Sequence, residues 1–296
     1  MKRPPELSRS PGGLAATIDD ILRLGAKAIG EQRAIDAEHL ARDALARDSQ
    51  HPGALHLLGV ALLAQKRARE AVAPLEQAAR QLANPKIETY LGRALSESGR
   101  ASEALTRLQS AIQYQPPFVA AHEELGILLC SMRRFEEAES VLKRGLEIEP
   151  TSVGLLLELG RVLIVRGDAR NAEIAFAKAL VNAPRSPRAL HGLGAALLYE
   201  GEIERAMERF RQVLAIQPGH VQAQLDLAHC LLHLGHSDDA IATLRAMVLS
   251  APKLYGKALR ALATDGRGRF WIRRSTADQF LSPGRAKTSP PERLPQ

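Results

Sequence analysis

Apolar residues recur at helical spacing along most of the chain, in pairs of short stretches separated by a polar break. Residues 153–186 show the pattern well. The first stretch places apolar or small side chains on one face at i, i+3, i+4 and i+7, at Leu156, Leu159, Gly160 and Leu163. After a break at Gly167 and Asp168, helical spacing resumes at Ala172, Phe176, Ala179 and Leu180. This pattern predicts two amphipathic helices joined by a tight turn.

The same pair of helices is repeated every 34 residues. A Leu-Gly pair recurs as Leu125-Gly126, Leu159-Gly160 and Leu193-Gly194. Extending this register predicts seven units, at 18–51, 52–84, 85–118, 119–152, 153–186, 187–220 and 221–254. The small residue of the first helix then falls at Gly25, Gly59, Gly92, Gly126, Gly160, Gly194 and Ala228, and the second unit is one residue short. A fixed period of this size is typical of a solenoid, in which each unit buries its face on its neighbours.

Glycine and proline mark the ends of the predicted helices. Glycines occupy the same slot between the two helices at Gly99, Gly167, Gly201 and Gly235, where a left-handed backbone is expected. Prolines are expected to end the second helix at Pro116, Pro150, Pro184, Pro218 and Pro252, because proline lacks the amide hydrogen and restricts the residue before it. Pro74 lies inside the second helix of the second unit, which predicts a kink there.

An alanine also recurs in the second helix, at Ala138, Ala172 and Ala206. With the Leu-Gly pair, this alanine, a small residue seven positions further on and the closing proline, residues 18–254 resemble the tetratricopeptide-repeat family. The resemblance implies an all-α fold, a right-handed superhelical solenoid of about seven helical hairpins with a C-terminal capping helix. The chain departs from the family pattern early in the first helix, where an aromatic residue is replaced at Leu55, Glu88 and His122. The repeated residues themselves are expected to be scaffold.

The resemblance also implies that the first helices line a concave groove that holds a peptide or a partner helix. The family's groove positions fall on His56, Lys86, Thr89, Arg93, Glu123, Ile127, Leu157, Arg161, Arg188, His191 and His229. Our hypothesis is that Arg93, Arg161 and Arg188 meet acidic or carbonyl groups of an extended partner. The alternative is that these arginines are solvated, or are paired with Glu97 or Glu158. The lysine and asparagine pattern with which some family members hold a C-terminal carboxylate is missing, which argues against binding of chaperone tails.

Composition agrees with closely packed helices. Apolar residues make up 45 % of the chain and aromatic residues only 4 %, whereas strands favour aromatic and β-branched residues. The two cysteines, Cys130 and Cys230, provide neither a disulfide framework nor a zinc-binding spacing, which predicts a reducing, cytoplasmic location. No apolar run approaches the ~18 residues that would span a bilayer, and the start of the chain lacks the core of a signal peptide.

The net charge of +7 belongs to the two ends of the chain. Residues 1–13 carry +2 and residues 253–296 carry +7, whereas residues 14–252 carry −2. A near-neutral array argues against a nucleic-acid groove, and no DNA-binding motif is present. We expect residues 1–13 and 282–296 to be disordered basic tails.

The histidines of the last unit are candidate metal ligands. His229 and His233 lie four residues apart, with Cys230 and His236 nearby and His191 on the preceding unit. A site needs three or four converging ligands, so we favour ordinary polar groove residues over a metal. The sequence also has no nucleophile elbow, phosphate-binding loop or dinucleotide fingerprint, which predicts no catalytic residues and no cofactor.

The segment 255–281 differs from the repeats. Residues 255–264 are expected to form a capping helix, and the tryptophan that follows stands beside arginines, at Trp271, Arg273 and Arg274. One interpretation folds this segment back onto the last unit. The other makes it an anchor for an acidic partner, RNA or an anionic membrane surface.

Repeats of this kind also precede glycosyltransferase and sulfotransferase domains, so a regulatory module of such an enzyme is an alternative. The 42 residues after the array are too few for a catalytic domain of the usual ~100 residues or more. We therefore predict a non-enzymatic scaffold or adaptor that binds other proteins.

Overall fold

The structure is a computed structural model that describes residues 17–263 and residue 281. Within these residues it contains fifteen α-helices, one short 3₁₀ helix and no strand, which confirms the all-α prediction. The chain divides into two compact units, residues 1–132 and residues 133–296.

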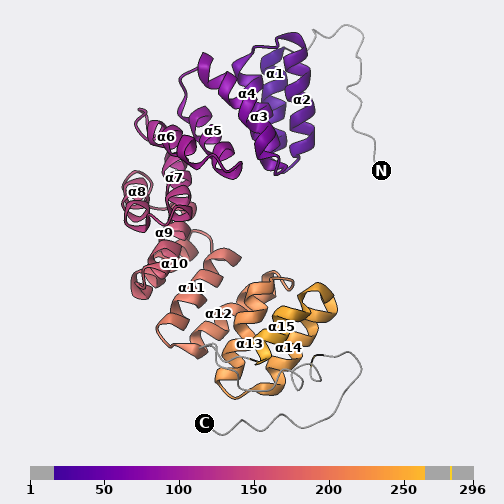
Figure 1. Cartoon of the computed structure of the whole chain (residues 1–296), viewed down its shortest axis with the longest axis vertical. Coiled ribbons are helices and arrows are strands. Elements are labelled where there is room, and N and C mark those ends of the chain that lie inside the picture. Colours follow the sequence, from indigo (N-terminus) through magenta and orange to yellow (C-terminus); the bar gives the residue numbers. More distant parts are fainter. Residues whose placement is uncertain (1–16, 264–280, 282–296) are drawn as a thin grey trace. The chain divides into compact units, whose positions relative to one another are not determined.

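Unit 1 contains the first seven helices (Figure 1). They are α1 (Ile18–Gly30), α2 (Ala34–Arg47), α3 (Pro52–Ala64), α4 (Ala68–Gln81), α5 (Pro85–Glu97), α6 (Ala101–Ala111) and α7 (Val119–Ser131). Each of α1, α3 and α5 packs against the helix that follows it, and each hairpin also packs against the next one.

Unit 2 contains the remaining helices (Figure 1). They are α8 (Phe135–Ile148), α9 (Val153–Val165), α10 (Ala169–Asn182), α11 (Pro187–Tyr199), α12 (Ile203–Ile216), α13 (Val221–His233), α14 (Ser237–Ser250), η1 (Pro252–Leu254) and α15 (Tyr255–Ala263). Consecutive helices pack together as in a solenoid of helical hairpins, and α15 packs against α13 and α14. The predicted capping helix is thus present at the end of the described array.

Sequence signals set the helix starts. Thr17 opens α1 with a capping box, in which its hydroxyl accepts the amide of Asp20 while the Asp20 carboxylate accepts the amide of Thr17. A proline occupies the first position of several first helices, where the missing amide hydrogen costs nothing. These prolines are Pro52, Pro85 and Pro187.

The small residues make room for large side chains of the second helices. The recurring alanines of the second helices are fully buried, and also buried are the leucines and phenylalanines of the second helices that face Gly59, Gly92, Gly160 and Gly194. In unit 1 an added Cβ at Gly92 would lie 2.5 Å from Cγ of Leu108, which is closer than real carbon contacts come. In the hairpins that carry these four glycines, the core therefore depends on a glycine in the first helix and a leucine or phenylalanine in the second.

The structure corrects the predicted role of Pro116. Four of the five closing prolines stand two residues after the end of a second helix, but α6 ends at Ala111, five residues before Pro116. This junction carries a second proline, Pro117, so two successive residues are restricted to extended geometry.

Pro74 does not interrupt α4, which continues as one helix from Ala68 to Gln81. Proline has no amide hydrogen, so the carbonyl of Glu70 loses its partner within the helix. The residue that the second hairpin lacks is missing from the loop before α5, which has three residues, 82–84, where the loop before α3 has four.

The left-handed turns are confirmed at the four glycines, with φ between +80° and +89°. The same slot in the other three hairpins holds Gln32, Lys66 and Arg133, with φ of 60°, 64° and 60°. The tight turn is thus made in all seven hairpins, and three of them make it with a side chain that opposes it.

Candidate functional site

The predicted groove residues lie on the first helices of successive hairpins. In unit 1 they form what we call the unit 1 groove face, which consists of His56 on α3, Lys86, Thr89 and Arg93 on α5, and Glu123 and Ile127 on α7. In unit 2 they form the unit 2 groove face, which consists of Leu157 and Arg161 on α9, Arg188 and His191 on α11, and His229 on α13. The packing of α3 on α5, α5 on α7 and α9 on α11 sets these residues in neighbouring rows.

Two arginines of the unit 2 groove face share one buried carboxylate. Nη2 of Arg161 lies 2.6 Å from Oε2 of Glu158, and Nη2 of Arg188 lies 2.8 Å from Oε1 of the same side chain. The Glu158 side chain is only 5 % exposed, whereas those of Arg161 and Arg188 are 49 % and 67 % exposed. A buried carboxylate needs a cation, and here it has two, so the cluster retains one positive charge.

His191 connects α11 to α13. Its Nε2 lies 2.8 Å from Oδ2 of Asp226, and the side-chain amide of Gln222 donates from Nε2 to the other oxygen of Asp226 at 3.0 Å. The His191 ring also lies 5.5 Å from the Phe210 ring and 5.3 Å from the His220 ring. This side chain is therefore held from several sides, and its orientation is set by tertiary contacts.

Burial disfavours the charged form of two neighbouring histidines, His220 and His229. Burial lowers the pKa of His229, although Asp226 acts in the opposite direction. Burial and the neighbouring His191 likewise lower the pKa of His220. Nε2 of His229 is buried, and within the part of the chain that the structure describes it has no hydrogen-bond partner.

On the unit 1 groove face, His56 packs beside an aromatic ring and a cation. Its ring lies 5.4 Å from that of Tyr90, and burial together with Lys86 lowers its pKa from 6.5 to about 4. The Lys86 ammonium lies 5.9 Å from the centre of the Phe118 ring, a distance at which a cation–π attraction operates.

Arg93 is paired with two carboxylates of its own unit. Its Nε donates to Glu97 at 2.9 Å, and its Nη1 lies 3.6 Å from Glu124. All three predicted arginines are thus paired within the chain, Arg93 with Glu97 and Arg161 and Arg188 with Glu158, as the alternative to our hypothesis proposed.

Two predicted groove residues have little surface. Thr89 is 2 % exposed, and its hydroxyl donates to the carbonyl of Pro85 at 2.6 Å. Leu157 is buried as well, whereas Glu123 and Ile127 on α7 are partly buried. The side chains with most accessible surface on the predicted positions are Lys86, Arg161 and Arg188.

Comparison with known proteins identifies the family. A family model described as tetratricopeptide repeat matches residues 95–152 and 197–263. A second model with the same description matches residues 28–85, 128–187 and 157–207. Together the matches cover residues 28–85 and 95–263, more than half of the chain. The chain belongs to the tetratricopeptide-repeat family.

Solved structures of other tetratricopeptide-repeat proteins share the fold. PilW, a type IV pilus biogenesis factor, is 22 % identical with a TM-score of 0.62, over 70 % of this chain and 96 % of that one. PilF of Pseudomonas aeruginosa is 20 % identical with a TM-score of 0.59, over 70 % of this chain and 95 % of that one. A tetratricopeptide-repeat protein from Parabacteroides merdae is 16 % identical with a TM-score of 0.61, over 83 % and 98 %. No curated protein matches the chain.

The described part of this tetratricopeptide-repeat array offers no cluster of three or more residues placed to hold a metal. Cys130 and Cys230 are buried and are not joined in a disulfide, and burial raises the pKa of the Cys230 thiol to about 12. A thiol with so high a pKa carries almost no thiolate at neutral pH, so it is a poor nucleophile and metal ligand. No described helix is both long and apolar enough to cross a membrane.

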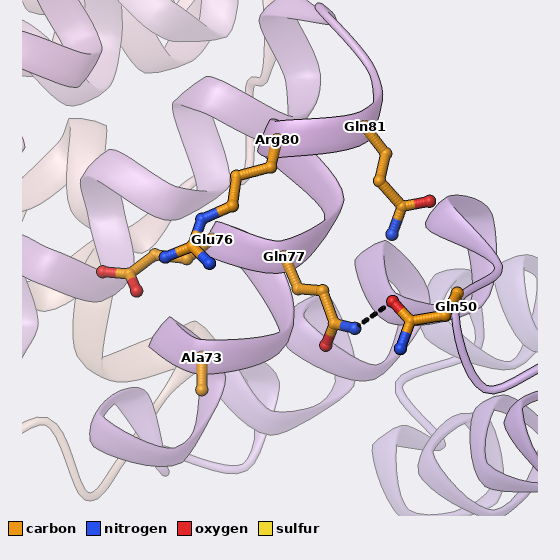
Figure 2. A pocket seen from close by; sticks show the side chains of 6 residues that line it. All are labelled: Gln50, Ala73, Glu76, Gln77, Arg80 and Gln81. Carbon is orange, nitrogen blue, oxygen red and sulfur yellow. Dashed lines mark hydrogen bonds between the residues drawn. The ribbon is translucent and has the colours of Figure 1, made fainter.

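Unit 1 also contains a pocket that no sequence motif predicts. It has a volume of about 420 Å³ and lies on α4 and the loop before α3 (Figure 2). Its lining consists of Gln50, Ala73, Glu76, Gln77, Arg80 and Gln81. Figure 2 shows the Gln77 amide directed at Gln50, to which it donates a hydrogen bond of 2.5 Å. These polar residues follow no repeat or motif, so the sequence contains no signal for the pocket.

The predicted contact residues of the C-terminal segment, Trp271, Arg273 and Arg274, lie outside the described residues. The two interpretations of that segment stay predictions, as do the two tails.

Proposed function

We propose that this protein-interaction scaffold binds an extended segment of a partner protein on its unit 2 groove face, with acidic groups of that segment on Arg161 and Arg188. Tetratricopeptide-repeat proteins are protein-interaction scaffolds in general, and the chain shares that role through its family. The observation that carries the finer proposal is the sharing of Glu158 by both arginines.

The charge balance favours an acidic group. Glu158 offsets one of the two guanidinium charges, so a ligand carboxylate finds an uncompensated positive charge. The Glu158 carboxylate also fixes the arginine side chains, which reduces the rotamer entropy that binding would otherwise cost. Each guanidinium has five N–H donors, and Arg188 uses one of its Nη2 donors on Glu158, so donors remain for a ligand.

Apolar surface beside the arginines would take the partner's neighbouring side chains. Ile164 on α9, Ala195 and Leu198 on α11, and Leu225 on α13 are partly buried in the predicted groove register. Such alternation of charge and apolar surface suits an extended peptide, whose successive side chains point in opposite directions.

The test is the binding of a fluorescein-labelled 12-residue peptide with alternating leucine and glutamate to the full chain, followed by fluorescence anisotropy. Arg188→Gln removes one cation and leaves Arg161 on Glu158, so the fold is kept. A charge-assisted hydrogen bond contributes about 1.5–3 kcal/mol, so we expect affinity to fall by about 10-fold or more. Added salt should weaken the wild-type complex in the same direction.

Arg205→Gln is the matched control, because Arg205 of α12 forms a similar ion pair of 2.8 Å with Glu173 in the same unit but lies on a second helix. Equal losses of affinity in Arg188→Gln and Arg205→Gln would mean that the peptide follows net charge and not the groove face. Unchanged affinity in Arg188→Gln would refute the proposed site.

A further inference from the structure

We propose that the outer side of α10 is a second docking surface, which takes an amphipathic helix of a partner protein bearing acidic residues beside its apolar face. The surface consists of a stripe on α10, formed by Ile174, Lys178 and Val181, and of the pocket that opens beside it between α8, α9 and α10. It is separate from the unit 2 groove face, which lies on first helices.

Ile174 of the stripe departs from the pattern of the other second helices of unit 2. Ile174 is 48 % exposed and Val181 is 79 % exposed, and their spacing of seven residues places them on one face of α10. The residues at the register of Ile174 are Ser140 in α8, Glu208 in α12 and Ala242 in α14. Small or polar residues therefore suit this position elsewhere in the unit, and the repeat scaffold gives no reason for isoleucine.

More than half of the residues that line the adjoining pocket are apolar. It has a volume of about 260 Å³, and Leu156, Leu159 and Leu163 of α9 line it together with Leu146 of α8. Ile174 forms part of its wall. Sites for small organic ligands usually measure about 300–1,000 Å³, so this pocket is sized for one bulky side chain of a partner.

The charged residues that line the pocket favour an acidic residue on the partner. Lys143 is paired with Glu139 at 2.6 Å, and Asp168 is engaged in capping α10 through Asn171. Lys178 also lines the pocket, and the structure gives its ammonium no partner among the described residues. A glutamate or aspartate next to the inserted apolar side chain would supply the missing charge.

The form of the partner follows from backbone hydrogen bonding. The backbone groups of α10 are used within the helix, so this surface offers no row of donors and acceptors to an extended strand. A partner helix satisfies its own backbone and presents apolar side chains at i and i+7, a separation of about 10 Å that matches Ile174 and Val181.

The test uses a fluorescein-labelled amphipathic helical peptide, stapled to hold its helix, with leucines at i, i+4 and i+7 and glutamates flanking them. A second peptide carries lysines in place of the glutamates. Fluorescence anisotropy with the full wild-type chain should show micromolar binding of the glutamate peptide and at least about 10-fold weaker binding of the lysine peptide.

Val181→Asp should weaken binding of the glutamate peptide at least about 10-fold, and the substituted side chain is too exposed to disturb the fold. Lys178→Glu should reverse the preference between the two peptides. Ala215→Asp is the matched control, because Ala215 is an exposed residue of α12 at the register of Val181. Arg188→Gln reports on the unit 2 groove face, and both of these variants should bind as the wild type does.

Three outcomes would overturn the proposal. The wild-type chain could fail to bind either peptide, or Val181→Asp could bind as well as the wild type. The chain could also self-associate in sedimentation velocity and become monomeric on Val181→Asp, which would make the occupant a second copy of this chain.

Discussion

The ring of Phe176 on α10 lies between two glycines, and each glycine can be tested by adding one methyl group. An added Cβ at Gly160 on α9 would lie 2.6 Å from Cζ and 2.8 Å from Cε1 and Cε2 of this ring. An added Cβ at Gly192 on α11 would overlap three atoms of the same ring. The ring is buried and enclosed from both sides, so it cannot move away from one methyl without approaching the other helix.

Two opposing effects set the change in unfolding free energy that we expect for Gly192→Ala. Alanine is about 1 kcal/mol better than glycine inside a helix, whereas forcing a methyl into a filled core costs typically 1–3 kcal/mol. We expect the cost of overpacking to exceed the gain in helix propensity, because the overlapped ring has no space into which it can move. We expect a net loss of about 1–2 kcal/mol in unfolding free energy, or a few degrees in melting temperature.

The decisive comparison is a double-mutant cycle with Phe176→Leu. Leucine occupies the register of Phe176 in earlier hairpins, at Leu142 and Leu108, so it suits this position. Phe176→Leu should remove the overlap, and the double variant should be more stable than the sum of the single losses predicts. Urea unfolding followed by circular dichroism measures each variant.

Gly256→Ala is the control, since an added Cβ at this position of α15 meets nothing within 4 Å. It should leave stability unchanged or raise it by up to about 1 kcal/mol. The packing argument fails if Gly192→Ala is as stable as Gly256→Ala, or if the effects of Gly192→Ala and Phe176→Leu simply add.

Two further predictions concern the turns and the buried histidine. Lys66→Gly should stabilise the chain by up to about 1 kcal/mol, because the backbone φ of 64° at this position strains any side chain. Gly167→Ala should cost a similar amount, although its added Cβ has open space around it. Melting temperatures that shift in opposite directions would confirm both predictions, and shifts of the same sign would contradict the strain argument. The lowered pKa of His56, about 4 against 6.5, means that the folded chain resists protonation, so stability should be complete above about pH 6.5 and fall by at most about 3 kcal/mol as the pH drops to 4. His56→Leu should flatten this part of the urea-midpoint profile against pH, and an unchanged profile would show that His56 is not the group responsible.

Local residues carry the information about where helices begin and end. Gly167 and Pro184 bracket the second helix of their hairpin, and α10 lies between them as predicted. The same rules failed at Pro116, where α6 ends early, and they did not foresee that Lys66 and Arg133 take a left-handed turn without glycine. A turn demanded by hairpin packing can thus impose a conformation that the residue itself disfavours.

The groove residues illustrate a second limit. The register correctly places Arg161 and Arg188 on first helices, and the sequence offers Glu158 as a possible partner. The repeat register does not indicate that one carboxylate binds both arginines, nor that Thr89 is buried with its hydroxyl bonded to the carbonyl of Pro85. Ile174 and Val181 carried no motif, and their exposure became apparent only on the folded helix.

The sequence by itself determined the family, the number of hairpins and the small-residue register, because these depend on spacing along one helix or between two adjacent helices. The tertiary structure alone decided which side chains meet across hairpins, such as Arg188 with Glu158, His191 with Asp226, and Phe176 with Gly192. Residues of the first two pairs stand 30 and 35 positions apart, so their contact depends on how one hairpin stacks on the next. The repeat period reports that stacking occurs but not which side chains meet, since its marks are the same in every unit.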